Sequence, residues 1–199
     1  IHQVNSQAGF LAGTLTDVRV DARGVLTLAA DVETVAQVSE PFAFAVTTLP
    51  DGWAIGTGGE GRVLKVTRDG AVSVLFDAAE ANVFALHADD DGTVYAGTSP
   101  SGKIYRIRPG GPGGASEVTP FFDPQEKYIW ALAVDASGRL WVGAGNPAVI
   151  YRVDPSGAGL EKLTQSTTWD VRWASSDAAG RIVYELGGEL WLYDVKSKA

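Results

Sequence analysis

The stretch Trp130-Ala-Leu-Ala-Val-Asp-Ala-Ser-Gly138-Arg-Leu-Trp-Val-Gly143 decides how the chain folds, because the chain repeats it. One copy earlier reads Phe84-Ala-Leu-His-Ala-Asp-Asp-Asp-Gly92-Thr-Val-Tyr-Ala-Gly97. Further copies surround Gly52 and, more loosely, Gly180, and a weak copy lies at Gly24. The four stronger turn glycines are 40, 46 and 42 residues apart, so one repeat unit holds about 43 residues.

Within each unit, apolar residues alternate with a period of two, and no segment has a convincing helical period. In the second full unit, this alternation predicts strands over residues 83–89, 93–98, 103–108 and 116–122. Pairs such as Asp91-Gly92 separate the strands and supply the positive φ of tight hairpin turns. Four antiparallel strands repeated at this interval are typical of one blade of a β-propeller. We therefore predict an all-β fold, a small β-propeller, with a β-sandwich or a β-solenoid as the alternative.

The predicted propeller is a single domain over residues 1–199, with about five four-stranded units, the first of them abnormal. The N-terminal strands lie in residues 1–39, and the blades are residues 40–79, 80–124, 125–165 and 166–199. The last blade has only three predicted strands, and an open strand edge invites association. We expect residues 8–30 to supply the fourth strand and close the ring, through either residues 10–16 or residues 25–29. The alternative is an incomplete ring that closes when two chains assemble.

The composition excludes several classes of function. The chain has no Cys, so disulfides, thiol nucleophiles and Cys-ligated metals are absent. It has 16 basic and 24 acidic residues, a net charge of −8, which argues against a nucleic-acid partner. No apolar run approaches the roughly 18 residues of a membrane helix, so we expect no membrane span.

Two motifs that resemble ligand loops are explained by the repeat. Residues 97–103 fit a phosphate loop, but the equivalent segments of other units are hairpin loops, and no helix follows. Residues 89–91 are three consecutive aspartates at a turn, and they lack the ligand spacing of a calcium loop. No nucleophile elbow occurs, so we predict no catalytic residue and no metal or other cofactor, with a divalent cation as the alternative.

The blades resemble known families. Asp-Ala-Ser-Gly-Arg-Leu-Trp-Val-Gly (135–143) resembles the repeat of bacterial two-component-regulator propellers, and it is also similar to propellers of the SMP-30/gluconolactonase type. Trp169-Asp-Val-Arg-Trp173 and residues 180–194 resemble a blade of the tricorn-protease-like propeller. The change of repeat type near residues 164–168 is either natural divergence or a recombination joint, natural or engineered.

Three glutamates share one register. Glu40, Glu80 and Glu126 each lie 12 residues before the turn glycine of their unit. In a propeller this places them around the mouth of the central channel, where like charges favour a cation or a basic partner. The alternative is that each glutamate caps backbone amides of its own blade.

The resemblance to SMP-30-type lactonases implies a divalent metal held by one Glu, two Asn and one Asp. Glu40 and Asn82 match part of that set, and Asp170 is the nearest further residue. Because the set is incomplete, lactonase activity is an alternative and not the prediction.

Aromatic residues occupy two kinds of position. Phe44, Phe84 and Trp130 fall at one place in the unit, and we expect them to pack in the core between blades. Tyr128 and Trp169 fall at the loop face, where an exposed ring beside carboxylates stacks on a sugar or a peptide side chain.

These features favour a non-catalytic binding or interaction module. Its expected partner is a protein, a peptide or a carbohydrate at the loop face, bound near Glu40, Glu80, Asn82, Glu126, Tyr128 and Trp169. One alternative is an enzyme, a metal-dependent lactonase or the propeller part of a tricorn-like peptidase. Another is an engineered or recombined propeller without an evolved ligand. We expect a bacterial, exported protein, either monomeric or self-assembling through unpaired blade edges.

Overall fold

A computed structural model describes residues 16, 18–21, 23–30, 32–111, 114–135, 137–166, 169–176, 181–194 and 197. The chain divides into two compact units, Ile1–Val35 and Ala36–Ala199. All seventeen regular elements of the described residues are β-strands. There is no helix among them with the length and hydropathy needed to cross a membrane. The all-β prediction is therefore confirmed.

Residues 36–199 form four successive antiparallel units, which we call blades I to IV; one pairing between strands of the first two blades joins them into an eight-stranded sheet. Blade I contains β3 (Phe42–Leu49), β4 (Gly52–Gly58), β5 (Arg62–Thr67) and β6 (Val72–Asp77). Blade II contains β7 (Asn82–Ala88), β8 (Val94–Ser99), β9 (Ile104–Arg108) and β10 (Glu117–Phe122). Blade III contains β11 (Tyr128–Val134), β12 (Leu140–Gly145), β13 (Ala148–Val153) and β14 (Leu160–Ser166). Blade IV contains β15 (Val171–Ser176), β16 (Arg181–Leu186) and β17 (Glu189–Asp194).

Each strand of a blade pairs with the next strand in the sequence, which is the up-and-down order of a propeller blade. The predicted strands of blade II agree with the observed ones to within one residue at each end. Glycines with positive φ close the first hairpins of blades II and III, as the Asp-Gly and Ser-Gly pairs predict. Gly92 donates its N–H to the carbonyl of Asp89 at 2.9 Å, and Gly138 donates to Asp135 at 2.8 Å.

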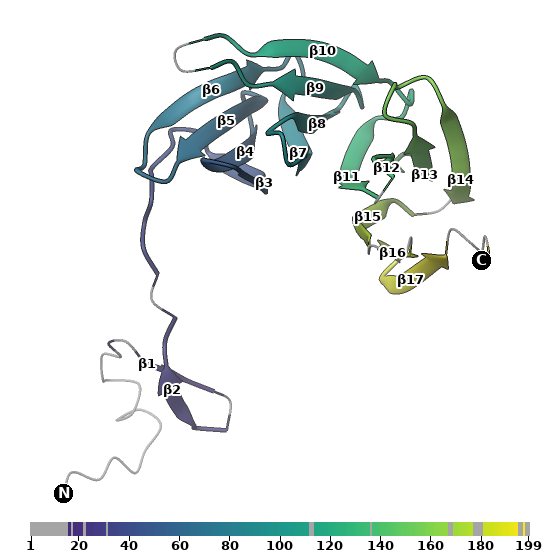
Figure 1. Ribbon diagram of the computed structural model, residues 1–199. Helices are drawn as coiled ribbons and strands as arrows, with labels where there is room; N and C mark the ends of the chain where they lie inside the picture. Colours follow the sequence, from purple (N-terminus) through teal and green to yellow (C-terminus); the bar gives the residue numbers. More distant parts are fainter. Residues whose placement is uncertain are drawn as a thin grey trace, which may run out of the picture. The chain divides into compact units, whose positions relative to one another are not determined.

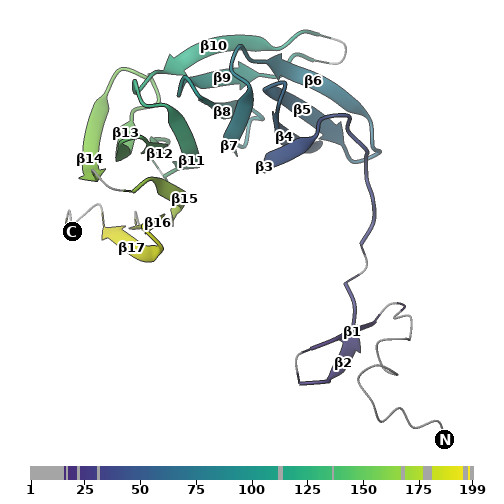
Figure 2. The same ribbon diagram turned by 180° about the vertical axis from the view of Figure 1, so that it is seen from behind.

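The first strand of every blade faces the concave side of the arc that the blades form. Figures 1 and 2 show β3, β7, β11 and β15 along this side from opposite directions, and β6, β10 and β14 on the convex side. Neighbouring first strands also contact one another, β3 with β7, β7 with β11, and β11 with β15. The first strands therefore lie next to one another along the concave side within residues 36–199.

The hydrophobic core lies between consecutive blades and not inside any one of them. Between blades II and III, residues such as Ile104, Ile129 and Val149 are fully buried. A second cluster joins blades I and II around Val63 and Val83, and a third joins blades III and IV. Blades are thus stabilised by the faces they share, so the two end blades each keep one face without a blade packed on it.

The predicted ring closure is not found in the described residues. The described strands of the N-terminal segment, β1 (Val18–Val20) and β2 (Leu26–Leu28), pair with each other as a two-stranded sheet. The sheet of blade IV has three strands, and no strand of the described residues pairs with the outer edge of β17. β1 occupies one edge of β2, and the donation of residues 25–29 to blade IV stays a prediction. The other predicted donor, residues 10–16, lies almost wholly outside the described residues.

Candidate functional site

The inner strands of all four blades carry a β-bulge at the same place. The cross-strand register shifts between Ala43 and Ala45, between Val83 and Ala85, and between Ile129 and Ala131. In blade IV it shifts between Arg172 and Ser175. A bulged residue has no partner directly opposite, so its side chain is turned out of the ordinary alternation. Each bulge contains one aromatic residue, and we call these four the bulge aromatics: Phe44, Phe84, Trp130 and Trp173.

The bulge aromatics follow one another across the blades on the concave side. The ring centres of Phe44 and Phe84 are 4.8 Å apart, and those of Phe84 and Trp130 are 4.9 Å apart and stacked. Phe44 is 45% exposed and Trp173 is 75% exposed, while Phe84 and Trp130 are half-buried. The expectation of core packing is therefore wrong for Phe44, whereas Phe84 and Trp130 are half-buried and pack against rings of neighbouring blades. The rings of these three residues contact one another from blade to blade beside the bulges.

A cavity of about 280 Å³ is lined by the four bulge aromatics together with Arg172, and we call it the aromatic cavity. Blades I to III each contribute one residue and blade IV contributes two, so the cavity exists only when all four blades are in register. Trp173, which lines the cavity, has a backbone φ of 47°, in the left-handed region. That conformation is costly for a bulky residue and persists only where the surroundings hold it, which is a frequent property of binding sites.

Arg172 forms one wall of the aromatic cavity. Its guanidinium lies 4.7 Å from the centre of the Trp130 ring, which is the geometry of a cation–π contact. Glu185 lies directly opposite Arg172 on the neighbouring strand, yet it uses Oε1 to accept the N–H of Gly188 at 2.8 Å. Asp170 accepts the N–H of Asn146 at 3.0 Å. Within the described part of the chain, Arg172 forms no ion pair with a carboxylate.

A second cavity of about 460 Å³ adjoins the first at Arg172, and we call it the Trp169 cleft. Its lining residues are Trp169, Asp170, Arg172, Glu185, Gly187 and Gly188. Trp169 is 63% exposed and lies against Gly187, where an added β-carbon would come within 2.8 Å of the indole. The turn glycine therefore provides the space in which the indole lies. The expectation that Trp169 is exposed beside carboxylates is met by its position in this cleft.

Tyr128 stacks on Trp130 with ring centres 5.2 Å apart, so it supports the aromatic row from the start of β11. Asn82 begins β7 and makes the single backbone pairing that connects blades I and II, opposite Gly58. A β-carbon on Gly58 would lie 3.0 Å from the side-chain oxygen of Asn82. Asn82 thus occupies a tight junction between two blades.

Glu80 and Glu126 occupy equivalent buried places in blades II and III. Glu80 accepts a hydrogen bond from the Tyr105 hydroxyl at 3.3 Å and lies 3.4 Å from the Lys103 ammonium. Glu126 accepts one from the Tyr151 hydroxyl at 2.6 Å, and its second oxygen has no hydrogen-bond partner. Burial and the hydrogen bond to Glu126 raise the pKa of the Tyr151 phenol well above its ordinary value. Both carboxylates therefore bind the third strand of their own blade.

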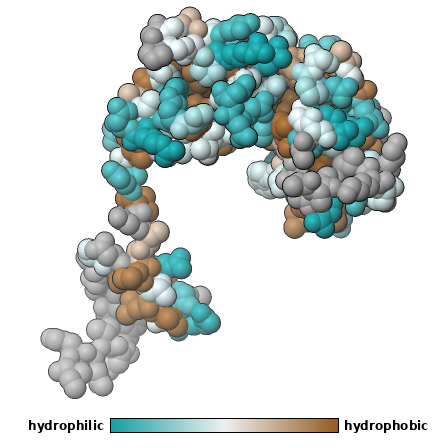
Figure 3. All heavy atoms as spheres, viewed as in Figure 1, coloured by the Kyte–Doolittle hydropathy of each residue, from teal (hydrophilic) through white to brown (hydrophobic). Residues whose placement is uncertain are grey.

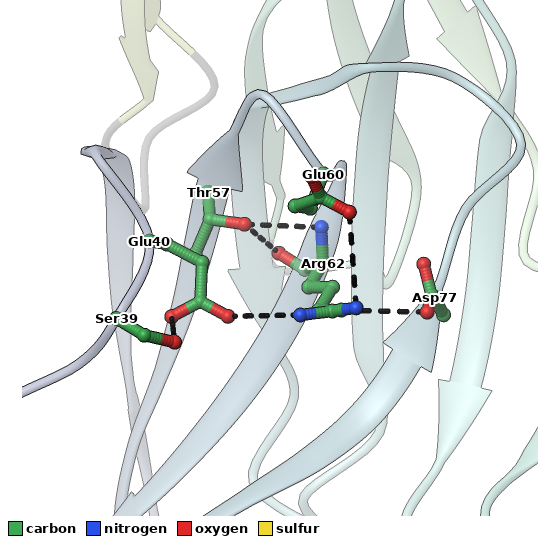
Figure 4. Close-up of polar contacts among 6 residues, drawn as sticks. All are labelled: Ser39, Glu40, Thr57, Glu60, Arg62 and Asp77. Carbon is green, nitrogen blue, oxygen red and sulfur yellow. Dashed lines mark hydrogen bonds and ion pairs between the residues drawn. The ribbon is translucent and has the colours of Figure 1, made fainter.

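Glu40 has the same arrangement in blade I with a different partner (Figure 4). Its carboxylate lies 3.4 Å from the Arg62 guanidinium, which also pairs with Asp77 at 3.3 Å. The Glu40 side chain is only 6% exposed. Thr57 accepts the backbone N–H of Arg62 and donates to its carbonyl, which holds this segment in place. The carboxylate of Glu40, like the other two, contacts side chains of its own blade.

The backbone at two of these glutamates is packed against a loop glycine of the preceding blade. A β-carbon on Gly61 would overlap the carbonyl oxygen of Glu80, and one on Gly102 would overlap that of Glu126. Both glycines have a positive φ. Among the described residues, no three His, Asp or Glu side chains form a group able to hold a metal ion.

Of the predicted site residues, Trp169 lines a cavity and Tyr128 contacts a cavity residue, Trp130, without lining either cavity. The glutamates and Asn82 lie at junctions within and between blades. Sequence reasoning missed Arg172 and Trp173. The signal was present, because Trp173 lies in the loose fourth copy where the other copies carry Phe or Trp. The bulge of blade IV spans two residues instead of one, so the fourth copy is one residue longer and does not align simply with the other copies.

Residues 124–146 match the family model described as "Two component regulator propeller". A search of curated protein sequences found no match. The chain is therefore a β-propeller chain with a regulator-type repeat in its third blade.

Solved structures with the same fold include enzymes and a chain from a protein complex. Virginiamycin B lyase from Staphylococcus aureus is 13% identical, with a TM-score of 0.60, over 89% of this chain and 62% of that one. A gluconolactonase from Xanthomonas campestris is 19% identical, with a TM-score of 0.59, over 88% and 63%. A chain of a nidogen/laminin complex is 15% identical, with a TM-score of 0.62, over 74% and 56%. This chain spans less than two thirds of each of them.

Proposed function

We propose that this protein is a non-catalytic binding module whose ligand enters the aromatic cavity and the adjoining Trp169 cleft. The observation that carries the proposal is the convergence of one bulge aromatic from each of four blades on a single cavity. A β-bulge interrupts strand pairing, and a left-handed φ at an exposed Trp costs conformational free energy. Packing of the fold alone does not require either feature. Exposed aromatic clusters on soluble proteins mark sites of interaction.

The chemistry of the lining residues favours binding over catalysis. Around the two cavities, the ionisable side chains that line them are Arg172, Asp170 and Glu185. Both carboxylates accept backbone N–H groups, which suits a structural anchor better than a general base. The lactonase and lyase folds among the neighbours keep an enzyme as the second candidate.

The neighbours also include a chain from a nidogen/laminin complex, which supports a protein or peptide ligand. The segment that matches the regulator propeller model is compatible with a sensing role. Carbohydrate is the remaining candidate, because an exposed indole next to carboxylates suits a sugar ring.

The test is a binding survey of the 199-residue protein by isothermal titration calorimetry, with peptides and oligosaccharides as separate panels. We expect at least one panel to bind, and Trp173→Ala to remove that binding. Trp191→Ala is the matched control, because Trp191 is also exposed in blade IV but lines neither cavity. Equal binding by both variants would contradict the proposal. Metal-dependent turnover of a lactone panel would favour the enzyme.

A further inference from the structure

We infer that the aromatic cavity and Arg172 together recognise an aromatic ring that carries a carboxylate on a short linker. This inference rests on the proposed binding function and names the chemical class of the ligand. The ligand is either a free arylalkanoate or the C-terminal aromatic residue of a peptide, which share this chemistry.

The size and walls of the aromatic cavity suit one aromatic ring. Four of its five lining residues are Phe or Trp, so the cavity offers apolar contacts on most sides. An apolar cavity of about 150 Å³ holds one benzene molecule. The volume of about 280 Å³ therefore accommodates a phenyl or indole ring with two or three further carbon atoms.

The charge at the cavity favours an anion over a cation. A cluster of aromatic rings would otherwise suit a quaternary ammonium group. Here the face of Trp130 is already covered by the Arg172 guanidinium at 4.7 Å, so a ligand cation would meet like charge. The cavity that remains is apolar with one positive group on its wall.

Arg172 is held ready for a ligand carboxylate by what surrounds it. The guanidinium carbon lies 4.7 Å from the centre of the Trp130 ring, and an arginine at an aromatic face still has its N–H donors available for hydrogen bonding. Its cross-strand neighbour Glu185 and the nearby Asp170 accept backbone N–H groups, and neither pairs with it among the described contacts. Because Arg172 lines both cavities, a carboxylate bound there would lie between the ring and the Trp169 cleft.

The Trp169 cleft distinguishes a free arylalkanoate from a peptide with a C-terminal aromatic residue. A free arylalkanoate fills only the aromatic cavity. A peptide that ends in Phe or Trp continues into the cleft of about 460 Å³, where Trp169 offers an exposed ring to the preceding residue. The Trp169→Ala substitution should therefore weaken binding of the peptide and leave binding of the arylalkanoate unchanged.

The experiment compares matched ligands on the full 199-residue protein by calorimetry. The probes are 3-phenylpropanoate, its amide, an acetylated tripeptide ending in Phe, and the same tripeptide as its C-terminal amide. We expect each acid to bind about tenfold to a hundredfold more tightly than its amide, which is the usual loss when a charge-assisted hydrogen bond is removed. Arg172→Gln should remove this difference.

Arg68→Gln is the control, since Arg68 also lies over an indole, that of Trp53, at 5.8 Å but lines neither cavity. It should keep the preference for acids. Equal binding of acids and amides would overturn the carboxylate inference while leaving the binding module intact. If all four probes fail while another panel of the binding survey binds at Trp173, the inference is likewise wrong. If no ligand of any panel binds, the proposed function itself fails.

Discussion

Gly102 lies so close to Glu126 of the next blade that a β-carbon on Gly102 would overlap the Glu126 carbonyl oxygen. Gly61 has the same relationship to Glu80 one blade earlier. These contacts set how closely a loop of one blade approaches the start of the following blade. They also explain why the glutamates recur at a fixed place, because the same segment carries the buried carboxylate and the backbone on which the glycine packs.

Replacing Gly102 with Ala should lower the free energy of unfolding by about 3 kcal/mol, as the sum of a left-handed φ and an overpacked contact. Its φ is 53°. Urea denaturation measures the change. Gly111→Ala is the control, because a β-carbon there meets nothing within 4 Å, and it should change the stability little. Equal effects of the two substitutions would contradict this account of blade spacing.

Asp135 should make the free energy of unfolding depend on pH in the acidic range. Its carboxylate accepts hydrogen bonds from Arg139 Nε at 2.9 Å and Trp141 Nε1 at 3.1 Å. Burial alone would raise the pKa of Asp135, but the hydrogen bonds from Trp141 and from the turn backbone outweigh burial and lower it. The stabilisation is therefore present above pH 3.8, the ordinary value, and is lost as pH falls through the lowered folded-state pKa.

We expect Asp135→Asn to lower the free energy of unfolding by about 2 kcal/mol at pH 7, the scale of hydrogen bonds to a charged group. The difference from the unmodified protein should shrink as the pH drops below 3.8. Thermal unfolding at several pH values checks this. Asp90→Asn, at an exposed turn position, is the control and should change the free energy of unfolding little at pH 7. A difference of constant size for Asp135→Asn would rule the explanation out.

The strands and the blade order follow from the sequence because alternation and turn glycines are local signals. The strands predicted for blade II and the turn at Gly92 needed no knowledge of distant residues. The position of Phe84 did not follow in the same way. Its repeat register identified it as equivalent to Trp130, but a period of two cannot reveal a bulge, and the bulge decides which way the ring faces.

The glutamates show a second limit of sequence reasoning. Their common register predicted equivalent places, and the structure places Glu80 and Glu126 equivalently. Their partners, however, lie more than 20 residues later on another strand, and they differ between blades. Lys103 approaches Glu80, whereas Val149 stands at the equivalent place for Glu126. Sequence spacing alone did not indicate whether these carboxylates meet each other or their own blades.

The conformation of Trp173 should separate stability from binding. Asn tolerates a left-handed φ far better than Trp, and the Trp173 side chain is mostly exposed. Trp173→Asn should therefore leave the free energy of unfolding unchanged or raise it by up to about 1 kcal/mol, while ligand binding is lost. Calorimetry and urea denaturation on the same sample measure both. If the variant were destabilised by several kcal/mol, the Trp173 side chain would be part of the packing that stabilises the fold.

The final blade should make the 199-residue polypeptide self-associate. Leu190 and Leu192 of β17 are 82% and 56% exposed, and no described strand pairs with the outer edge of β17. Figure 3 shows hydrophobic residues at the surface of this blade beside hydrophilic ones. An open edge with exposed apolar side chains is a template for pairing with another chain.

Light scattering at increasing concentration should therefore give a mass above that of one chain, and the double substitution Leu190→Lys with Leu192→Lys should return it to one chain. Lysine on an edge strand opposes pairing by charge and hydration. Leu28→Lys is the matched control, since Leu28 is also 82% exposed but lies in β2 outside the blades, and it should leave the mass unchanged. A single-chain mass for the unmodified protein at high concentration would show that the edge of β17 does not drive association.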